Sequence, residues 1–333
     1  MQSLAVKYRP HDFKDLTEQK VIVDILTNQV NTKTFKHAYL FTGPAGTGKT
    51  TSARIFADML NNGHCIPIEI DAASNSGVDN IRTVIEDSKK RDLNTEYKVF
   101  IIDECHSLSN GAWQAMLKLL EEPPKYSVFI LCTTDPQKIP NTIMSRVQRY
   151  HFNKISTEGV IKRLKYICAK EKVEYEEVAL SYIAKVSNGG MRDAITLLDK
   201  CLSLNDIISL ETVLKTLGRE PIDAQFTIVS KLCLKDETVI GEIEKIYSEG
   251  KDLKQFMKDF AKFTLDCAKY HIFNNLEYTS LPDTTENIEM MKKVSGEEVL
   301  NVVDLILEIN SAIKWENDPK ALIEMLMLKY CKG

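Results

Sequence analysis

The residues best suited to chemistry form a glycine-rich loop at positions 43–50, which reads Gly-Pro-Ala-Gly-Thr-Gly-Lys-Thr. Its spacing, G-x-x-x-x-G-K-T, is that of the phosphate-binding loop. The glycines permit backbone conformations with positive φ that turn consecutive N–H groups toward a phosphate. Lys49 supplies a positive charge for the β- and γ-phosphate oxygens, and Thr50 supplies a hydroxyl for Mg²⁺. The sequence therefore predicts a nucleoside-triphosphate site that comprises Gly43, Pro44, Ala45, Gly46, Thr47, Gly48, Lys49, Thr50 and Thr51.

Two adjacent carboxylates follow a strongly apolar run farther along the chain. Residues 99–102 are Val-Phe-Ile-Ile, and Asp103 and Glu104 come directly after them. Such a run is typical of a buried strand in a parallel sheet, and ligands bind at the carboxyl ends of these strands. Asp103 is placed to hold Mg²⁺, whereas Glu104 points differently and can polarise an attacking water. Cys105 and His106 complete a D-E-C-H sequence, but they lack further metal ligands nearby, so we expect structural contacts for them.

A second apolar run, at 127–132, ends in the hydroxyl residues Thr133 and Thr134. If this strand lies beside the strand that ends at Asp103, the hydroxyls lie next to the γ-phosphate. That placement makes the threonines candidate members of the site.

The elements that must position these residues follow from hydrophobic periodicity. Strand-like and helix-like patterns alternate through the first part of the chain, which predicts an α/β domain with a parallel sheet between helices. From about residue 156 the pattern is helical, with breaks at the Gly-Gly pair 189–190 and at Glu220-Pro221. The expected strands are 38–42, 66–70, 99–104, 127–134 and 148–152. The expected domains are a nucleotide-binding domain at 1–154, a small helical lid domain at 155–218 and an all-α domain at 219–333.

The composition describes an ordinary folded protein of 333 residues, 44% hydrophobic and 27% charged. A net charge of −4 argues against a chain that coats nucleic acid, so any contact with DNA has to be local. No apolar run approaches the ~20 residues needed to cross a bilayer, and we expect no signal peptide. The eight cysteines contain no C-x-x-C pair, which predicts reduced thiols of a cytosolic protein.

Several longer stretches of the chain are informative when they are taken together. In chain order they are His-Ala-Tyr-Leu-Phe at 37–41, Glu-Ile-Asp-Ala-Ala-Ser at 69–74, Leu-Glu-Glu-Pro-Pro at 120–124, Thr-Thr-Asp-Pro-Gln-Lys at 133–138, Ser-Arg at 145–146 and Gly-Gly-Met-Arg-Asp at 189–193. These stretches resemble one family, the bacterial DNA polymerase III gamma/tau subunits, which are clamp-loader ATPases of the AAA+ class. The resemblance covers residues 5–218 strongly and is only architectural beyond them. It implies an AAA+ domain, a helical lid and a C-terminal collar that forms the oligomer.

The resemblance implies a role for each residue of the two main motifs. Lys49 and Thr50 are similar to the Walker A contacts with ATP and Mg²⁺. Asp103 and Glu104 are similar to the Walker B residues, of which Asp103 contributes to the metal and Glu104 to catalysis. ATP and Mg²⁺ are thus the expected ligands.

Further residues resemble parts of the family's catalytic machinery outside these motifs. Thr134 resembles sensor 1, with Thr133 as the adjacent candidate, and Arg192 resembles sensor 2, which reaches the γ-phosphate from the lid. Arg146 resembles the arginine finger that enters the neighbouring subunit's site, so hydrolysis would depend on assembly. The residues that match the stretch around the adenine are Tyr8, Arg9, Pro10, Leu16 and Thr17.

The chain departs from the family pattern at two positions. The family's cysteine-rich zinc module lies between the phosphate-loop helix and the second strand, where residues 61–67 hold only Cys65. Zinc is therefore not expected. Val147 replaces the cysteine that usually follows Ser-Arg, a change that should not touch the chemistry. We also expect a short form without the tau-type extension.

The resemblance implies an ATPase subunit of the replicative clamp loader, which opens the sliding clamp and loads it on primed DNA, without polymerase activity. The implied partners are delta- and delta-prime-like subunits, further copies of the chain, the sliding clamp and primer–template DNA, in the cytoplasm and away from membranes. Asn75 and Lys138 are the residues proposed to contact DNA phosphates.

Two alternatives remain open at this point. A non-hydrolysing scaffold subunit of the same complex is opposed by the intact Lys49, Thr50, Asp103 and Glu104. A DNA helicase-like P-loop ATPase is suggested by the D-E-C-H sequence. It needs a second lobe with its own strand pattern, whereas residues 154–333 show helices.

Overall fold

The computed structural model describes residues 2–64, 66–92, 95–218, 222–281, 284–294 and 296–333. The chain forms two compact units. The first comprises Met1–Ile167 and Ser187–Thr196, and the second comprises Cys168–Val186 and Leu197–Gly333. The three-domain division at 1–154, 155–218 and 219–333 stays a prediction, and its second boundary adjoins residues 219–221, which lie outside the described residues.

A five-stranded parallel sheet forms the centre of the first unit, with the strand order β2-β3-β4-β1-β5. The strands are β1 (Ala38–Thr42), β2 (Ile68–Asp71), β3 (Lys98–Asp103), β4 (Ser127–Thr133) and β5 (Gln148–His151). β3 pairs with β4, so the strand that ends at Thr133 lies beside the strand that ends at Asp103. Because all strands are parallel, the carboxyl ends that carry Asp103 and Thr133 lie at one edge of the sheet.

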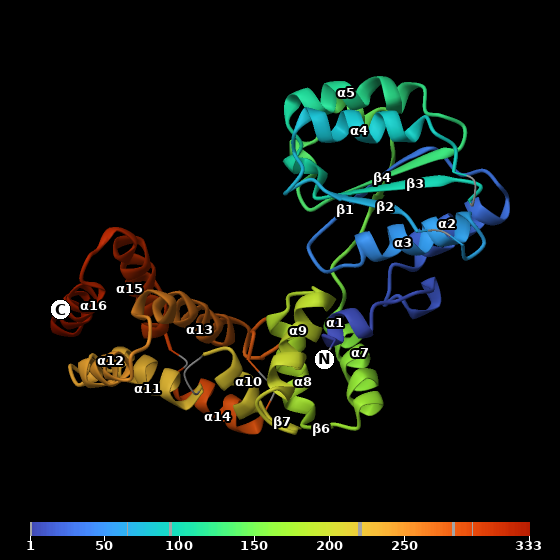
Figure 1. Ribbon diagram of the computed structural model, residues 1–333. Coiled ribbons are helices and arrows are strands. Elements are labelled where there is room, and N and C mark those ends of the chain that lie inside the picture. The colour runs from blue at the N-terminus through green and yellow to red at the C-terminus, as the bar shows by residue number, and fades with distance from the viewer. Residues whose placement is uncertain (1, 65, 93–94, 219–221, 282–283, 295) are drawn as a thin grey trace. The chain divides into compact units, whose positions relative to one another are not determined.

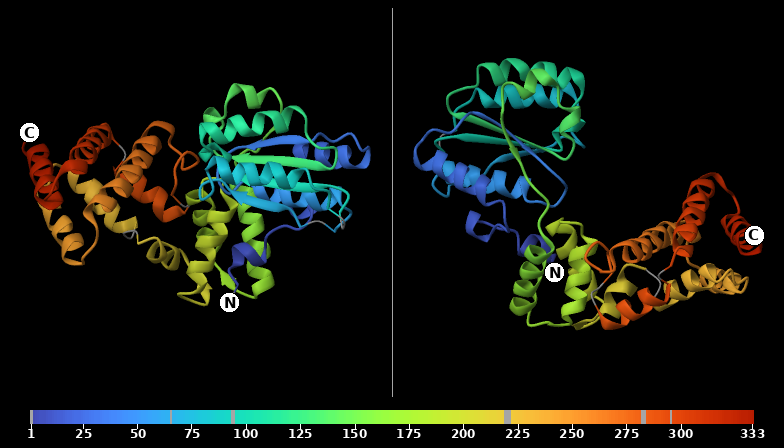
Figure 2. Two further views of the ribbon diagram at one scale, coloured as in Figure 1. Left: turned by 45° about the horizontal axis from the view of Figure 1, so that its top comes forward. Right: turned by 180° about the vertical axis from the view of Figure 1, so that it is seen from behind.

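Helices cover both faces of this sheet (Figures 1 and 2). One face packs against α4 (Val78–Ser88) and α5 (Asn110–Glu121), and the other against α2 (Lys20–Asn31) and α3 (Lys49–Leu60). Successive strand residues point to opposite faces, so neighbours such as Phe100 and Ile101 belong to different cores.

Burial on both faces explains why the strands are continuously apolar in sequence. Every residue of β4 is buried, and so is every residue of β1. Phe100 and Phe129 stack at 5.2 Å with 12° between their planes, a contact that adds about 0.5–1.5 kcal/mol beyond simple burial. The two central strands thus form a rigid base for the residues at their ends.

Short elements complete the first unit. They are α1 (Leu4–Lys7), η1 (Phe13–Asp15), η2 (Cys105–Ser107), η3 (Pro136–Lys138) and α6 (Asn141–Met144). We call residues 8–19 the N-terminal strap, and residues 152–156 the connector, which joins β5 to α7 (Thr157–Glu171). Buried Phe13 anchors the strap in the core between the sheet and α2 and α3.

The second unit, in the residues that the structure describes, is helical apart from one pair of two-residue parallel strands. Residues 222–331 contribute a single apolar core that includes Phe226, Phe260 and Phe263. The further elements are β6 (Glu174–Tyr175), α8 (Glu177–Val186), α9 (Met191–Leu202, which begins in the first unit), β7 (Ile207–Ile208), α10 (Leu210–Thr216), α11 (Ile222–Cys233), α12 (Val239–Ser248), α13 (Leu253–Phe273), α14 (Thr285–Val294), α15 (Glu298–Ala312), η4 (Ile313–Trp315) and α16 (Pro319–Lys332).

The fold class is confirmed, and the differences from the expected elements are small. β2 begins at Ile68 rather than residue 66, since Ile66 is 93% exposed and Pro67 has no N–H for a strand ladder. The β6–β7 pair was not predicted, because two residues give no periodicity. Among the described residues, no helix combines the length and the apolar character that a membrane span requires.

Candidate nucleotide-binding site

The phosphate-binding loop connects β1 to α3 and is closed by its own hydrogen bonds. Gly43, Gly46 and Gly48 have φ values of 139°, 71° and 100°, conformations that side-chain-bearing residues rarely adopt. The Lys49 ammonium donates to the carbonyl oxygens of Gly43 and Pro44, at 2.8 Å each. The Thr47 hydroxyl donates to the Pro44 carbonyl at 2.9 Å. The loop is therefore pre-formed as a cradle.

Replacing Gly43 by alanine is expected to destabilise the protein by more than the same change at Gly63. Both positions have positive φ, which costs about 1–3 kcal/mol for a non-glycine residue. A Cβ at Gly43 would lie 2.2 Å from the Phe152 carbonyl oxygen, whereas a Cβ at Gly63 meets nothing within 4 Å. Urea unfolding of the two variants measures this difference. Equal losses would show that the loop does not need its close approach to Phe152, which directly follows β5.

The loop leads into the N-terminus of α3, which has Gly48 as its N-cap residue and no side-chain cap. The first N–H groups of a helix have no partner within the helix, and they favour anions. Lys49 is only 6% exposed, and burial is the main reason that its pKa is lowered. A phosphate on this helix end would add negative charge beside the buried ammonium, so the cradle fits a nucleotide.

Thr50 and Asp103 meet at the carboxyl edge of the sheet. The Thr50 hydroxyl on α3 donates to the Asp103 carboxylate at the end of β3, at 2.8 Å. A hydroxyl and a carboxylate are the oxygen ligands that suit Mg²⁺, which retains several of its waters. The donor set therefore fits the predicted ion.

Glu104 is held in an unusual backbone conformation beside this pair. Its φ of 46° and ψ of 42° are left-handed, a strain that clusters at functional sites. Its carboxylate accepts a hydrogen bond from the Thr134 hydroxyl at 3.0 Å and lies 3.3 Å from Nδ1 of His106. The conformation turns the Glu104 side chain away from the course of β3, as its predicted role requires.

The hydroxyls of Thr133 and Thr134 bind different partners near Glu104. Thr134 binds the carboxylate directly, whereas the Thr133 hydroxyl lies 3.0 Å from Nδ1 of His106 and accepts from the Asp135 N–H. His106 and buried Cys105 thus make structural contacts, and burial raises the pKa of the Cys105 thiol. Among the described residues, no group of three or more His, Cys, Asp or Glu side chains could hold a metal ion. Cys65 lies outside the described residues, so the expectation about zinc stays a prediction.

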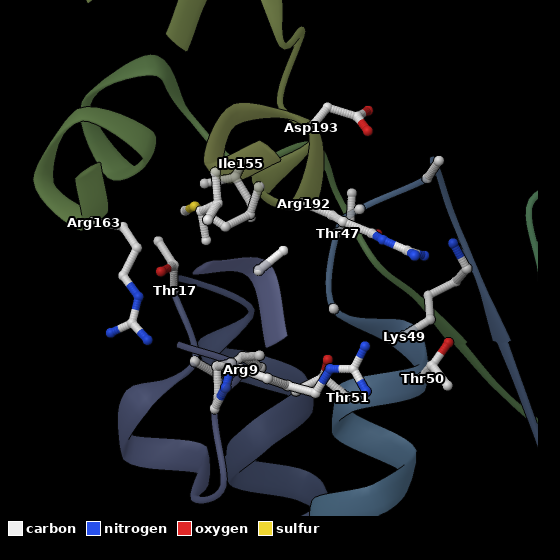
Figure 3. Close-up of a pocket in the computed structure, with 18 of the residues that line it drawn as sticks. Arg9, Thr17, Thr47, Lys49, Thr50, Thr51, Ile155, Arg163, Arg192 and Asp193 are labelled. Carbon is white, nitrogen blue, oxygen red and sulfur yellow. The ribbon is translucent and has the colours of Figure 1, made fainter. Parts of the chain in front are cut away.

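A pocket of about 300 Å³ lies over the loop and is bounded by the strap, by Arg163 of α7 and by the start of α9 (Figure 3). The predicted residues that line it are Tyr8, Arg9, Pro10, Leu16, Thr17, Ala45, Gly46, Thr47, Gly48, Lys49, Thr50, Thr51, Asp103, Glu104 and Arg192. Gly43 and Pro44 do not line it, because they form the base of the loop. Thr134 reaches it only through Glu104.

The start of α9 contacts the phosphate-binding loop directly. The Met191 N–H donates to the Gly46 carbonyl at 3.0 Å, and a Cβ on Gly46 would lie 3.0 Å from the Gly190 Cα. This close approach explains the glycines on both sides, and it places Arg192 at the pocket. In Figure 3 the side chains of Arg192 and Lys49 lie on the same side of the pocket.

The positive charges around the pocket repel one another. The pKa of Arg9 is lowered mainly by burial, and then by the nearby guanidinium groups of Arg54 and Arg192. Arg54 is itself paired with Glu69. Since Arg9, Lys49 and Arg192 all line the pocket, an anionic ligand is favoured there.

Arg146 lies apart from the residues that line the pocket of its own chain. It follows α6, and its Nε donates to the Glu121 carboxylate at 3.0 Å. Its other nitrogens donate to Glu121, to the Thr142 carbonyl and to the Ser145 hydroxyl. The position agrees with an action outside its own site, but the action itself stays a prediction.

The two residues proposed to contact DNA lie in loops beyond the carboxyl ends of strands. Asn75 follows β2 and binds the Asp71 carbonyl, and Lys138 ends η3 after β4 and lies 3.3 Å from Asp135. Both contacts are exposed, and the contact with DNA stays a prediction.

Sequence reasoning missed six residues that line the pocket: Ala5, Ile155, Arg163, Met191, Asp193 and Ile195. Met191 and Asp193 flank Arg192, so the Gly-Gly-Met-Arg-Asp stretch could have indicated them. Nothing in the local pattern marks Ile155 or Arg163, because tertiary folding brings them to the pocket.

The fold is that of an AAA+ protein. Solved structures of the Thermotoga maritima RuvB Holliday junction branch migration motor match 68% of this chain and 79% of theirs, with a TM-score of 0.53 and 20% identity. Two family models match parts of the chain. Residues 62–156 match the model described as DNA polymerase III, delta subunit, and residues 159–206 match that of the DNA polymerase III clamp loader subunit, ATPase lid domain.

Curated relatives define the family more narrowly. DNA polymerase III subunit gamma of Buchnera aphidicola subsp. Acyrthosiphon pisum is 31% identical, and the alignment covers 98% of each chain. DNA polymerase III subunit tau of Bacillus subtilis is 36% identical over 99% of this chain. The chain therefore belongs to the gamma/tau family of DNA polymerase III clamp-loader subunits. It spans 63% of the Bacillus subtilis tau subunit and 50% of the Mycoplasma genitalium gamma/tau subunit.

Proposed function

We propose that this chain hydrolyses ATP as a subunit of a clamp loader, opens a sliding clamp and loads it on primed DNA. One observation carries the proposal. Lys49, Thr50, Asp103 and Glu104 meet at one pocket, whereas Arg146 lies elsewhere on the same unit. Such a division suits a site that only a neighbouring subunit completes.

The triphosphate binds at the cradle between β1 and α3 in this proposal. Backbone N–H groups of the loop, the Lys49 ammonium and the N-terminus of α3 bind its oxygens. Arg192, held at the loop by the contact between Met191 and Gly46, approaches from the lid side. The base lies at the other end of the pocket, where the strap contributes Tyr8, Pro10 and Leu16.

Thr50 and Asp103 are the residues that would hold Mg²⁺. When bound, the ion neutralises charge that develops on the phosphate oxygens. Their mutual hydrogen bond keeps the hydroxyl and the carboxylate in one place before the nucleotide enters.

Glu104 orients and deprotonates the attacking water. The Thr134 hydroxyl binds one carboxylate oxygen, which fixes the rotation of the carboxylate. The left-handed backbone of Glu104 separates its side chain from that of Asp103, so two adjacent carboxylates can perform different tasks. General base catalysis of this kind contributes about 10²–10⁴ in rate.

Arg146 completes the site of a neighbouring subunit. Its four hydrogen bonds to its own subunit occupy nearly all the N–H donors of the guanidinium. It has to give up some of these contacts, including those with Glu121, to bind a phosphate. Assembly therefore controls hydrolysis, and the pairing with Glu121 keeps Arg146 idle in the free chain.

The remaining assignments extend the proposal to the complex. The partners are delta- and delta-prime-like subunits, further copies of this chain, the sliding clamp and primer–template DNA, in the cytoplasm of the cell. The domains at 1–154, 155–218 and 219–333 act as motor, lid and collar. Asn75 and Lys138 contact DNA phosphates.

The scaffold and helicase alternatives have less support. A non-hydrolysing scaffold has no need of the strained Glu104 and its bond to Thr134. A helicase of the kind considered requires a second lobe with strands. Within the described part of residues 157–333, the strands are the two-residue β6 and β7 alone.

Clamp loading in the complete complex tests the proposal. The full chain, its partner subunits, the sliding clamp and primed circular DNA are combined with ATP, and clamp retained on the DNA is measured beside ATP hydrolysis. Wild type should load the clamp only with ATP, and clamp plus DNA should stimulate hydrolysis. Lys49→Met, which removes the ammonium, should lose both activities. Hydrolysis in the complete complex that ignores both clamp and DNA would overturn the proposal, and strand displacement would favour the helicase.

A further inference from the structure

We infer that Arg163 is a positioning residue that fixes the base-binding wall of the pocket to the first helix of the lid, together with Glu18 and Gln19. The inference rests on the proposed function, because it concerns how the same pocket recognises the base of ATP. Nothing in the local sequence marks Arg163, yet it lines the pocket at the end far from Lys49 and Thr50 (Figure 3).

Arg163 attaches the start of the strap to α7. Its Nη2 donates to the Tyr8 carbonyl at 2.8 Å, and its guanidinium lies over the Tyr166 ring at 5.0 Å from the centroid. The Tyr8 ring meets the same Tyr166 ring edge-on, at 6.4 Å and 88°. Arg163 is thus held both by a hydrogen bond and by a ring face, and it can fix the backbone of Tyr8 and Arg9.

Gln19 attaches the end of the strap to the connector. Its side-chain amide donates to the Asn153 carbonyl at 2.7 Å and accepts from the Asn153 N–H at 3.2 Å. This pair of bonds reproduces the pattern of a strand ladder, and Gln19 is only 9% exposed. The register between strap and connector is therefore fixed.

Glu18 makes the third attachment, at the N-terminus of α7. Its carboxylate accepts from the Ser156 N–H at 3.1 Å and from the Ser156 hydroxyl, which in turn accepts from the Gly159 N–H. A negative charge at a helix N-terminus is favourable. Glu18 and Gln19 both have left-handed backbones, with φ of 60° and 58°. Two strained residues in succession persist because their side chains are bound in this way.

The three attachments make one wall from strap and connector. Tyr8, Leu16 and Thr17 of the strap and Ile155 of the connector all line the pocket. A purine fits such a surface, since its faces are apolar and its edge can bond to backbone groups. The wall is attached to α7, whereas Lys49 and the N-terminus of α3 lie at the phosphate-binding loop, so loss of the wall should weaken binding of the base more than binding of the phosphates.

The test compares two ligands that share phosphates but not a base. The dissociation constants of ATP and of inorganic tripolyphosphate are measured on the full chain for wild type, Arg163→Ala, Arg163→Lys and Lys162→Ala. Lys162 is the exposed neighbour on α7, and its loss removes the same charge. Arg163→Ala should weaken the affinity for ATP by about 10-fold, since a hydrogen bond from a charged group is lost at the wall. The affinity for tripolyphosphate should stay within about twofold of wild type, because the lost bond is only at the wall. Arg163→Lys should recover much of the ATP affinity, and Lys162→Ala should match wild type.

Kinetics in the complete complex separate positioning from chemistry. Arg163→Ala should raise KM for ATP by about 10-fold with kcat retained, as expected when only ground-state binding is lost. Equal weakening of both ligands, or a fall in kcat at unchanged KM, would overturn the inference. Failure of wild type to bind either ligand would instead overturn the proposed function. If Arg163→Ala does not fold, the affinities for ATP and tripolyphosphate are compared in Glu18→Gln instead. This variant removes the negative charge that binds Ser156, so it should show the same selective loss of ATP affinity.

Discussion

Replacing Arg146 by alanine should lower the ATP hydrolysis stimulated by clamp and DNA by about 10³-fold or more, with ATP binding unchanged. Arg146 does not line the pocket of its own chain, so its loss leaves the binding groups in place. A guanidinium that enters from a neighbour neutralises charge on the transferred phosphoryl group, an effect confined to the transition state. Steady-state hydrolysis of the assembled complex, beside the dissociation constant for ATP, measures both quantities.

Arg149→Ala is the matched control for this variant. Arg149 is exposed on β5 and carries the same charge, three residues from Arg146. The Arg149→Ala variant should hydrolyse ATP at the wild-type rate. A similar loss in both variants would attribute the effect to charge on this surface in general. Unchanged hydrolysis in Arg146→Ala would exclude the arginine from the site.

Replacing Glu104 by glutamine should lower hydrolysis by about 10²–10⁴-fold at saturating ATP, because the variant keeps the shape of the side chain but not the base. The amide can still accept from the Thr134 hydroxyl, so the local structure persists. Binding of ATP should remain within a few-fold of wild type, since Lys49, Thr50 and Asp103 are untouched. Single-turnover hydrolysis and equilibrium binding measure the two effects.

Glu122→Gln serves as the control, because Glu122 is exposed at the end of α5 and loses the same charge. It should leave hydrolysis unchanged. Loss of ATP binding in Glu104→Gln, in proportion to the loss of hydrolysis, would contradict the assignment of Glu104 to the chemical step.

The sequence predicted those parts of the site in which binding a phosphate or burying a strand requires particular residues at fixed positions. The loop at 43–50 has to place its glycines, Lys49 and Thr50 at set intervals to surround a phosphate. The apolar run before Asp103 has to be continuous, because both faces of β3 are covered. The pairing of β3 with β4 then brought Thr134 to the Glu104 carboxylate, although neither Thr133 nor Thr134 lines the pocket, and their place beside a γ-phosphate stays a prediction.

The rest of the site depends on tertiary contacts that leave no local pattern. Arg163 and Ile155 reach the pocket because the connector and α7 return to the strap, which no periodicity records. The pairing of Arg146 with Glu121 joins residues 25 positions apart. The left-handed conformation of Glu104 is likewise invisible in a sequence, because glycine, the usual signal for positive φ, is absent there.

Mixing the two inactive variants tests the central claim, that each active site is shared between subunits. An Arg146→Ala chain retains Glu104, and a Glu104→Gln chain retains Arg146, so one interface between them has both groups. In complexes assembled from equal amounts, about a quarter of the interfaces between copies of this chain should be active, since each active interface needs Glu104 from one copy and Arg146 from the next. Recovery of stimulated hydrolysis to roughly that fraction of wild type is the predicted result. No recovery above the separate variants, in complexes shown to contain both chains, would contradict the account.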